Sequence, residues 1–414
     1  MNILWLTNVT LADITEKENI RKPNLGGWIQ GLYNSLMYYY KDEINITLVF
    51  PAETRLRGLV NNTAYYSFVE TADVDEMEEF FYSIICDTKP DIIHIFGTEY
   101  LHSYSMIKAC EKGKLIDNTV VSIQGMVSVY ANHMYNNLPL RTVLSKNLFD
   151  IKYHTAIRYI TKDFFKRGEY EKKTIAIAKI ITGRTDWDKQ CTYLMNRSAK
   201  YYHCGEVLRD SFYQKEQWDI SKCKKKSIFF SQCDISLKGV HNAIEALYII
   251  KQDYNDVLLF VAGNTNIISP GNGLSSYERY VKNLIIKYNL QNNIVFLGPQ
   301  NEEEMLENYL RANVFVCASS IENSSNSVCE AMIVGTPVVA SQVGGMSNLI
   351  EHGKSGFLYQ ADAPYMLAYY VKRILEDDIL GSTISKNAVD IAQSRHNRKD
   401  IVKEIMRIYY GIAK

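Results

Sequence analysis

The sequence has little of what disordered, fibrous and nucleic-acid-binding proteins contain. Its 414 residues include only 8 Pro and 22 Gly, while 47% are hydrophobic and 22% are charged. This composition excludes disordered, collagen-like and coiled-coil chains. Net charge is zero, since 46 Lys and Arg balance 46 Asp and Glu, so the whole chain is not an electrostatic nucleic-acid binder. No apolar run approaches the roughly 20 residues that a membrane helix needs.

The 8 cysteines form neither a disulfide framework nor a metal site. The chain has no Cys-x-x-Cys, and its closest grouping (Cys191, Cys204, Cys223 and Cys233) lacks metal-ligand spacing. Reduced thiols that serve as small buried hydrophobic groups are typical of cytosolic proteins. The N-terminal stretch 1–8 lacks a basic start and becomes polar too early for a signal peptide. We therefore expect a cytoplasmic protein, with peripheral attachment to the cytoplasmic face of a membrane left open.

Short β-branched runs alternate with longer amphipathic stretches in two successive series. Strands are predicted at 2–7, 44–50, 91–96, 118–124 and 177–182, and again at 227–231, 257–262, 293–297, 314–318 and 337–341. Near-continuous apolar strands are typical of a parallel sheet that is covered on both faces. The predicted fold class is α/β, with two doubly wound domains.

The change of series sets the expected domain boundaries. We predict an N-terminal Rossmann-like domain over 1–205, a lysine-rich linker over 206–226 and a C-terminal Rossmann-like domain over 227–390. The segment 391–414 is predicted to form an amphipathic helix that packs back on the N-terminal domain.

A basic and aromatic segment covers 141–173. It has nine basic and four acidic residues, together with six aromatic ones. One interpretation is a solvated helix face, and the other is a surface that meets anionic lipid headgroups or a phosphorylated acceptor. Both stay open at this point.

The most informative stretch for chemistry is 319–345. A polar loop follows the predicted strand 314–318 and leads into a helix, with Asn326 or Ser327 as the expected N-cap. Backbone N–H groups at such a helix start favour an anion, most naturally a phosphate. Because carboxylates repel phosphate, Glu322 and Glu330 are better suited to the neutral hydroxyls of a ribose or sugar. A capping and surface role remains the alternative.

The same stretch resembles a known family. Glu322-x7-Glu330, a helix, then Gly335-Thr336-Pro337 and Gly344-Gly345 resemble the retaining family 4 glycosyltransferases of the GT-B fold. Lys238-Gly239 is similar to the family's phosphate-binding Lys-Gly. The resemblance covers 227–380 specifically and the N-terminal half loosely. It implies two Rossmann-like domains that face each other across a cleft, and transfer of a sugar from a nucleotide sugar to a hydroxyl with retention of configuration.

The resemblance also implies roles for individual residues. Lys238 would neutralise the departing diphosphate and Glu322 would hold the donor sugar, and these two would be the catalytic residues. Donor-binding positions are implied at Gly26, Gly27, Lys238, Glu322, Asn323, Ser324, Ser327, Val328 and Glu330. The expected donor is a nucleotide-diphosphate sugar, with UDP favoured over GDP and no further cofactor. The expected acceptor is a bacterial-type surface polysaccharide or a lipid-linked glycan.

Two departures from the family pattern matter. The family's diphosphate-binding Arg is absent, because the matching positions read Ser231-Gln232-Cys233. The family's His near the reacting sugar is replaced by Gln124, which can form hydrogen bonds but cannot carry a proton. Candidates for the acceptor side or for the missing charge are Glu99, His102, Gln124 and Arg184. A structural role for Glu99 and His102 stays open.

Two Asp-x-Asp motifs were weighed as metal sites. Asp73-x-Asp75 lies in an acidic stretch that is predicted to be helical. Asp186-x-Asp188 is predicted to start a helix, with Thr185 or Asp186 as its cap, and no metal is expected at either motif. Two alternatives to a transferase remain: a GT-B nucleotide-sugar epimerase and a nucleotide-sugar-binding protein without catalysis.

Overall fold

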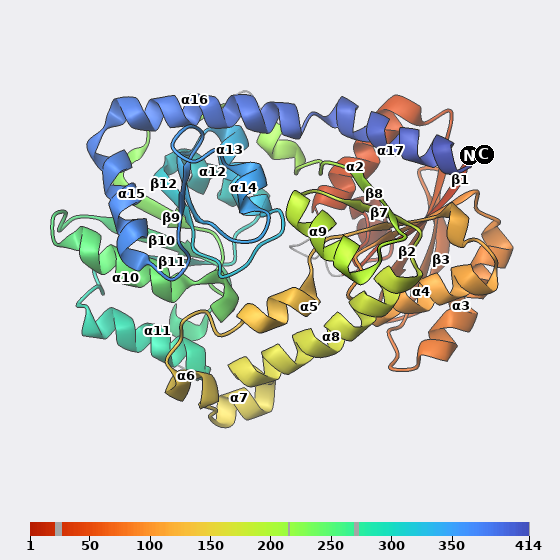
Figure 1. The fold of residues 1–414 in the computed structure, drawn as a ribbon, viewed down its shortest axis with the longest axis horizontal. Coiled ribbons are helices and arrows are strands. Elements are labelled where there is room, and N and C mark those ends of the chain that lie inside the picture. Colours follow the sequence, from red (N-terminus) through yellow and green to blue (C-terminus); the bar gives the residue numbers. More distant parts are fainter. Residues whose placement is uncertain (21–26, 214–215, 269–272, 414) are drawn as a thin grey trace. The chain divides into compact units, whose positions relative to one another are not determined.

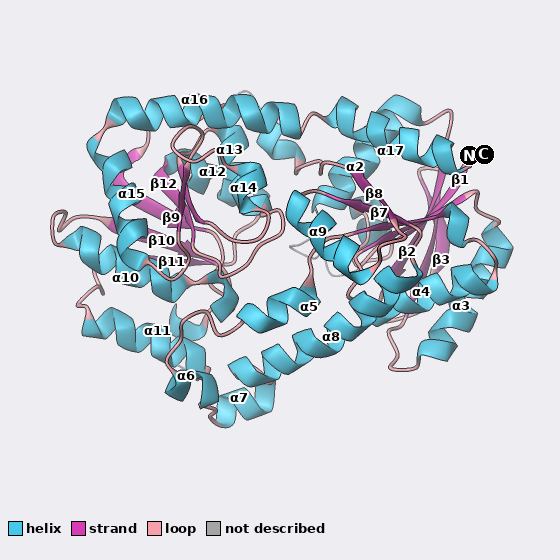
Figure 2. Ribbon diagram, in the orientation of Figure 1, coloured by secondary structure: helices cyan, strands magenta, loops and turns pink. Residues whose placement is uncertain are grey.

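The computed structural model describes residues 1–20, 27–213, 216–268 and 273–413. The chain divides into two compact units (Figure 1). The first unit contains Met1–Val129, Phe165–Arg209 and His396–Lys414, and the second contains Tyr130–Phe164 and Asp210–Arg395. In both units helices cover a central sheet (Figure 2), as the alternating pattern of the sequence predicts.

The first unit is built on an eight-stranded sheet in the order β3-β4-β2-β1-β5-β6-β7-β8. Every neighbouring pair is parallel except β3 and β4. The strands are β1 (Asn2–Leu6), β2 (Asn45–Pro51), β3 (Arg57–Val60), β4 (Thr63–Phe68), β5 (Ile92–Phe96), β6 (Thr119–Ser122), β7 (Ile180–Gly183) and β8 (Lys200–His203). All five residues of β5 are buried, which explains why its sequence shows no alternation.

Helices complete the first unit. They are α1 (Ala12–Lys17), α2 (Gly27–Tyr40), α3 (Val74–Thr88), α4 (Leu101–Lys112), α9 (Asp186–Met195) and α17 (Arg398–Ile412). The short helix α5 (Val127–Tyr130) crosses the boundary between the units, and α8 (Ile157–Ile177) begins in the second unit and ends in the first. Helix α17 buries Ile401, Ile405 and Ile408, and Trp5 Nε1 donates to the Tyr409 hydroxyl at 3.2 Å.

The second unit has a six-stranded parallel sheet in the order β11-β10-β9-β12-β13-β14. Its strands are β9 (Lys224–Phe230), β10 (Leu258–Ala262), β11 (Ile294–Gly298), β12 (Ala312–Cys317), β13 (Val338–Ser341) and β14 (Phe357–Tyr359). Its helices are α6 (Leu140–Leu144), α7 (Leu148–Tyr153), α10 (Val240–Lys251), α11 (Ser276–Lys287), α12 (Glu302–Arg311), α13 (Asn326–Val334), α14 (Met346–Leu349), α15 (Pro364–Glu376) and α16 (Asp378–Arg395).

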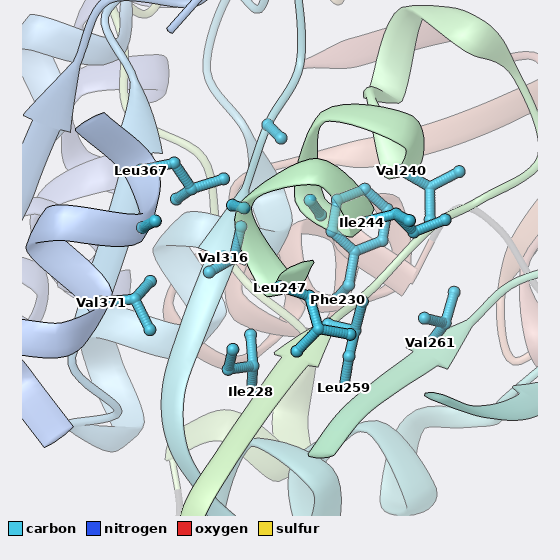
Figure 3. Close-up of a cluster of buried hydrophobic side chains, with 14 of the residues drawn as sticks. Ile228, Phe230, Val240, Ile244, Leu247, Leu259, Val261, Val316, Leu367 and Val371 are labelled. Atoms are coloured by element: carbon cyan, nitrogen blue, oxygen red, sulfur yellow. The ribbon is translucent and has the colours of Figure 1, made fainter. Parts of the chain in front are cut away.

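The core of the second unit lies between its sheet and helices α10 and α15 (Figure 3). The sheet contributes Ile228, Phe230, Leu259, Val261 and Val316, and the helices contribute Val240, Ile244, Leu247, Leu367 and Val371. Burial of such side chains stabilises each by about 1.5–3 kcal/mol relative to exposure. This packing holds the carboxyl ends of β9 and β12 rigidly, where the candidate site lies.

The predicted strands lie within three residues of the observed ones, but the domain boundaries differ. Residues 130–164 belong to the second unit rather than to a continuous N-terminal domain. The stretch predicted as a linker is largely packed: Trp218 is buried and donates to the Ala312 carbonyl at 2.6 Å. Lys224–Lys226 begin β9. A lysine run reads as a solvated linker, yet here it starts an otherwise apolar strand.

Candidate functional site

The loop after β12 and the start of α13 form the centre of the site. The N-cap of α13 is Ser325, so the prediction of Asn326 or Ser327 was wrong by one or two residues. The Ser325 side chain makes no capping hydrogen bond with any described residue. The Oδ1 atom of Asn326 is buried and accepts no hydrogen bond within the described part of the chain. The helix start thus combines a positive dipole end with N–H groups that its cap side chain does not use.

A second loop approaches this one through a glycine. Ser236–Lys238 form a 3-10 turn, and Gly239 follows with a φ of +76°. A Cβ at Gly239 would lie 2.0 Å from the Ala318 carbonyl oxygen, so only glycine permits this approach. The Ser320 N–H donates to the Leu237 carbonyl at 2.9 Å. Gly239 therefore lets this loop approach the end of β12 closely, which places Lys238 there.

Lys238 and Glu322 form an ion pair. Lys238 Nζ donates to Glu322 Oε1 at 2.7 Å, and the two side chains are 22% and 8% exposed. Burial favours a lower pKa for the Lys238 ammonium, but the Glu322 carboxylate outweighs it and raises the pKa above its ordinary value. Ser319 Oγ donates to the same carboxylate oxygen at 2.7 Å. Lys238 is therefore charged at neutral pH.

Two glycines fix the backbone of Glu322. The Gly345 N–H donates to the Glu322 carbonyl at 3.0 Å. A Cβ at Gly344 would lie 2.0 Å from that carbonyl oxygen, and Gly344 has a φ of +49°. The Gly-Gly motif thus has a physical reason: it lets the loop after β13 support the carboxylate-bearing loop after β12.

The second carboxylate lies inside α13. Glu330 is 5% exposed, and the Tyr309 hydroxyl lies 3.4 Å from its Oε2 atom. Glu330 is the fifth residue of the helix, which agrees with the predicted position of one to two turns into it. Buried carboxylates favour hydroxyl partners over anions, since a phosphate would add like charge.

The structure brings together most of the predicted donor residues in the second unit. They are Lys238, Glu322, Asn323, Ser324, Ser327, Val328 and Glu330, all on the two loops and the first turns of α13. The Val328 side chain is buried, so its backbone is the part that can contribute. Sequence reasoning missed Ser319 and Tyr130, whose hydroxyl accepts from the Asn323 N–H at 2.7 Å. Only the polar character of the loop hinted at Ser319, and nothing in the spacing indicated Tyr130.

Gly27, one of the two glycines expected to bind the donor, belongs to the first unit. Gly26 lies outside the described residues. Gly27 is the first residue of α2, and a Cβ there would lie 2.6 Å from Cγ of Arg209. The absence of a side chain at Gly27 therefore leaves room for Arg209.

The acceptor-side candidates all follow strands of the first unit. Strands β5, β6 and β7 are parallel neighbours, so Glu99, Gln124 and Arg184 lie at the same edge of its sheet. The Arg184 guanidinium donates to the Gln124 carbonyl and to the Glu206 carboxylate. Sequence reasoning missed Glu206, because its partner is 22 residues away and shares no motif with it. Arg184 is thus neutralised within the first unit.

The other two candidates have structural partners. Thr98 N–H donates to Glu99 at 3.0 Å, and Arg167 lies 3.4 Å from the same carboxylate. His102 Nδ1 contacts Glu70 at 2.9 Å. The His102 ring stacks on that of Tyr100. These contacts support the structural alternative that the sequence left open for both residues.

Both Asp-x-Asp motifs lie at helix starts, which was predicted for Asp186-x-Asp188 only. Asp73 is the N-cap of α3 and accepts from the N–H groups of Asp75 and Glu76. Thr185 is the N-cap of α9 and forms a capping box with Asp188. Across residues 1–20, 27–213, 216–268 and 273–413, no three His, Cys, Asp or Glu side chains are grouped as metal ligands. In the same ranges no helix has both the length and the apolarity to span a bilayer.

Comparison with known proteins identifies the domain that holds the site. Residues 212–390 match the family model described as "Glycosyl transferases group 1". This segment is thus similar to the group 1 glycosyltransferase domains. It contains Lys238, Glu322 and Glu330, and it coincides with the sheet of the second unit.

Curated relatives match over part of their length. The chain is 29% identical over 172 residues to an uncharacterized glycosyltransferase of Methanocaldococcus jannaschii, which covers 42% of the chain and 41% of the relative. It is 28% identical over 178 residues to the D-inositol 3-phosphate glycosyltransferase of Corynebacterium urealyticum, again 42% and 41%. The chain thus spans about two fifths of the length of these relatives.

Solved structures resemble the whole chain in fold. Anabaena Alr3699/HepE in complex with UDP and glucose aligns with a TM-score of 0.68, 16% identity, and coverage of 99% of this chain and 100% of that one. Together with the two α/β units, this resemblance shows that the chain has the GT-B fold, as predicted.

Proposed function

We propose that the protein is a retaining glycosyltransferase of family 4 that moves a sugar from a nucleotide-sugar donor to a hydroxyl acceptor. One observation carries the proposal: the 2.7 Å Lys238–Glu322 pair beside the start of α13, with Glu330 buried in the same helix. The Lys238 ammonium and the N-terminus of α13 suit the diphosphate of a nucleotide-diphosphate sugar. The carboxylates of Glu322 and Glu330 can accept hydrogen bonds from its sugar and ribose hydroxyls.

Each group has a distinct role in this proposal. Lys238 and the N–H groups of α13 stabilise the diphosphate as it leaves, when its negative charge grows. Glu322 accepts hydrogen bonds from the sugar, and Glu330 accepts them from the ribose. Glu322 also keeps Lys238 protonated and in place when no donor is bound.

Retention follows from a front-face reaction. The bond between the anomeric carbon and the leaving phosphate oxygen breaks as the acceptor oxygen forms its bond on the same face. That phosphate oxygen takes the acceptor's proton, so no side chain has to act as a base. The oxocarbenium-like centre is stabilised by the retained diphosphate.

The finer assignments belong to the same proposal. The donor is a hexose nucleotide, with UDP before GDP; Alr3699/HepE, which shares the fold, was solved with UDP and glucose. The acceptor is a surface polysaccharide or lipid-linked glycan, and the protein acts in the cytoplasm or at its membrane face. Metal is not required, because Lys238 and α13 supply positive charge. They also compensate for the Arg missing at Ser231-Gln232-Cys233.

A panel assay tests the proposal. The protein is incubated with labelled UDP- and GDP-sugars and with glycan or lipid-linked acceptors, with and without chelator, and nucleotide release and product anomer are measured. Transfer with retention in chelator is expected. Conversion of the donor without acceptor would identify an epimerase, and tight nucleotide binding without turnover would identify a binding protein. Inversion, or activity restored only by Mn²⁺ or Mg²⁺, would overturn the mechanism.

A further inference from the structure

Helices α6 and α7 of the second unit carry five large exposed apolar side chains. Leu140 and Leu144 lie one turn apart on α6 and are 69% and 52% exposed, and Leu148 and Ile151 on α7 are 85% and 48% exposed. Tyr153 at the end of α7 is 53% exposed. We name these five residues the α6–α7 ridge. Large apolar side chains that are this exposed and this close in sequence indicate a surface that contacts another molecule.

The exposed charged residues of the segment 131–162, which contains the ridge, are all basic. Between residues 131 and 162 the basic residues are Arg141, Lys146, Lys152, Arg158 and Lys162, and all five are exposed. The only carboxylate in the same range is Asp150, which is fully buried. The exposed charges of this segment are therefore all basic, while Asp234 and Glu278 of neighbouring elements line a cavity together with Tyr153.

The burial of Asp150 has a structural cause. Its carboxylate accepts from the Asn147 N–H at 2.9 Å, from the Ser276 N–H at 3.1 Å and from the Thr155 hydroxyl at 2.9 Å. Asn147 Nδ2 also donates to the Leu274 carbonyl at 2.8 Å. These bonds hold α7 against the start of α11, and α6 packs on α11 as well (Figure 1). The hydrogen bonds of Asn147 and Asp150 thus fix the position of α7, which carries part of the ridge.

We infer that the α6–α7 ridge docks on a membrane that contains anionic lipids. The apolar side chains would enter the boundary between headgroups and acyl chains, while the surrounding lysines and arginines would contact lipid phosphates. Charge complementarity favours this occupant, because the basic surface repels a second copy of itself. The inference narrows the basic segment 141–173 to residues 141–162. In the remaining part of α8 the exposed Asp163 and Glu169 partly offset the basic residues.

Vesicle sedimentation tests the inference without donor or acceptor, so its outcome is independent of transferase activity. Wild-type protein is expected to bind vesicles of phosphatidylcholine with phosphatidylglycerol, and to bind less in high salt. Vesicles of phosphatidylcholine alone should bind at least tenfold less. The double variant Leu144→Ser/Leu148→Ser should lose about tenfold or more of its binding, and Lys146→Glu/Lys152→Glu should lose a similar amount.

Matched controls come from the same unit. Ile379 is 80% exposed at the start of α16, so Ile379→Ser should bind vesicles like wild type, as should Lys386→Glu. Equal binding to neutral and anionic vesicles, or no binding, would overturn the inference. Self-association in solution that Leu144→Ser/Leu148→Ser abolishes would identify a second copy as the occupant instead. Competition by inorganic phosphate at constant ionic strength would indicate a phosphate site rather than a lipid surface.

Discussion

Each unit has an ion pair near the carboxyl end of its sheet, and the two pairs differ in how far solvent reaches them. In the second unit Lys238 and Glu322 pair with each other beside a helix start, and the lysine side chain keeps 22% exposure. In the first unit Arg184 pairs with Glu206, and these side chains are only 10% and 7% exposed. An ion pair that solvent reaches can exchange its partner for a substrate, whereas a buried one is part of the framework.

Replacement of Lys238, which removes the more exposed of these two ion pairs, should have the largest effect of the changes considered. Lys238→Ala is expected to reduce turnover at saturating donor by about 100-fold, equivalent to about 3 kcal/mol, because its charge acts on the leaving diphosphate. Steady-state kinetics measure it, with Lys386→Ala as the control. Turnover within a factor of two of wild type would show that Lys238 is not the diphosphate partner.

The first unit should respond to pH through Glu171. Its carboxylate is fully buried and accepts from the N–H groups of Val127 and Ser128. Burial raises the pKa of Glu171 from 4.5 to about 7, although the Ser128 hydrogen bonds act to lower it. The folded state therefore holds the proton more tightly than the unfolded state does. Its contribution to stability is fully present below pH 4.5 and is lost as the pH rises through 7.

Denaturant unfolding of wild type and Glu171→Gln checks this expectation. The free energy of unfolding of wild type should fall by up to about 3 kcal/mol between pH 4.5 and 8 relative to the variant. Glu169→Gln, on the exposed side of α8, is the control. Parallel pH profiles for wild type and Glu171→Gln would contradict the assignment.

Replacement of Glu330 tests the second unit's hydroxyl-binding role. Glu330→Ala should weaken nucleotide binding by about 30-fold or more, because two charge-assisted hydrogen bonds to ribose are lost, while the fold is kept. Calorimetric titration with free UDP measures the affinity, and the exposed Glu303→Ala serves as control. Unchanged affinity would remove Glu330 from the site.

The smallest expected effect concerns Tyr409 in the first unit. Its hydroxyl accepts from Trp5 Nε1 at 3.2 Å and contacts His94 Nδ1 at 2.6 Å. Tyr409→Phe removes both hydrogen bonds in a buried place and should cost about 1–2 kcal/mol of unfolding free energy. Tyr410→Phe, on the exposed face of α17, should cost less. Equal losses would show that the buried network contributes nothing.

The features that could be predicted from the sequence are those that depend on residues close together in the chain. Strands appear as apolar runs because both faces of each sheet are covered, and Gly239 and Gly344 stand where any Cβ would collide with a carbonyl. The Lys238–Glu322 site could be predicted because each part sits in a short motif. Here the spacing alone places Glu330 on the helix that follows Glu322.

Features that depend on distant partners could not be predicted. Glu206 neutralises Arg184 from outside any motif, and Tyr130 reaches Asn323 across 193 residues. The assignment of residues 130–164 to the second unit depends on Asp150, whose partner Ser276 is 126 residues away. Only the folded chain brings these groups together, so propensity and spacing carry no trace of them.

The first unit is built from three separate segments of the chain, and their order in the sequence sets when each becomes available during synthesis. Its strands β1 to β8 are synthesised before most of the second unit, yet His396–Lys414 follow that unit in the chain. Until α17 emerges, Trp5 and His94 have no Tyr409 to bond, and the surface that α17 buries stays open to water. The second unit ends at Arg395 and can complete its sheet first. The first unit therefore cannot complete its fold until the whole second unit has been synthesised.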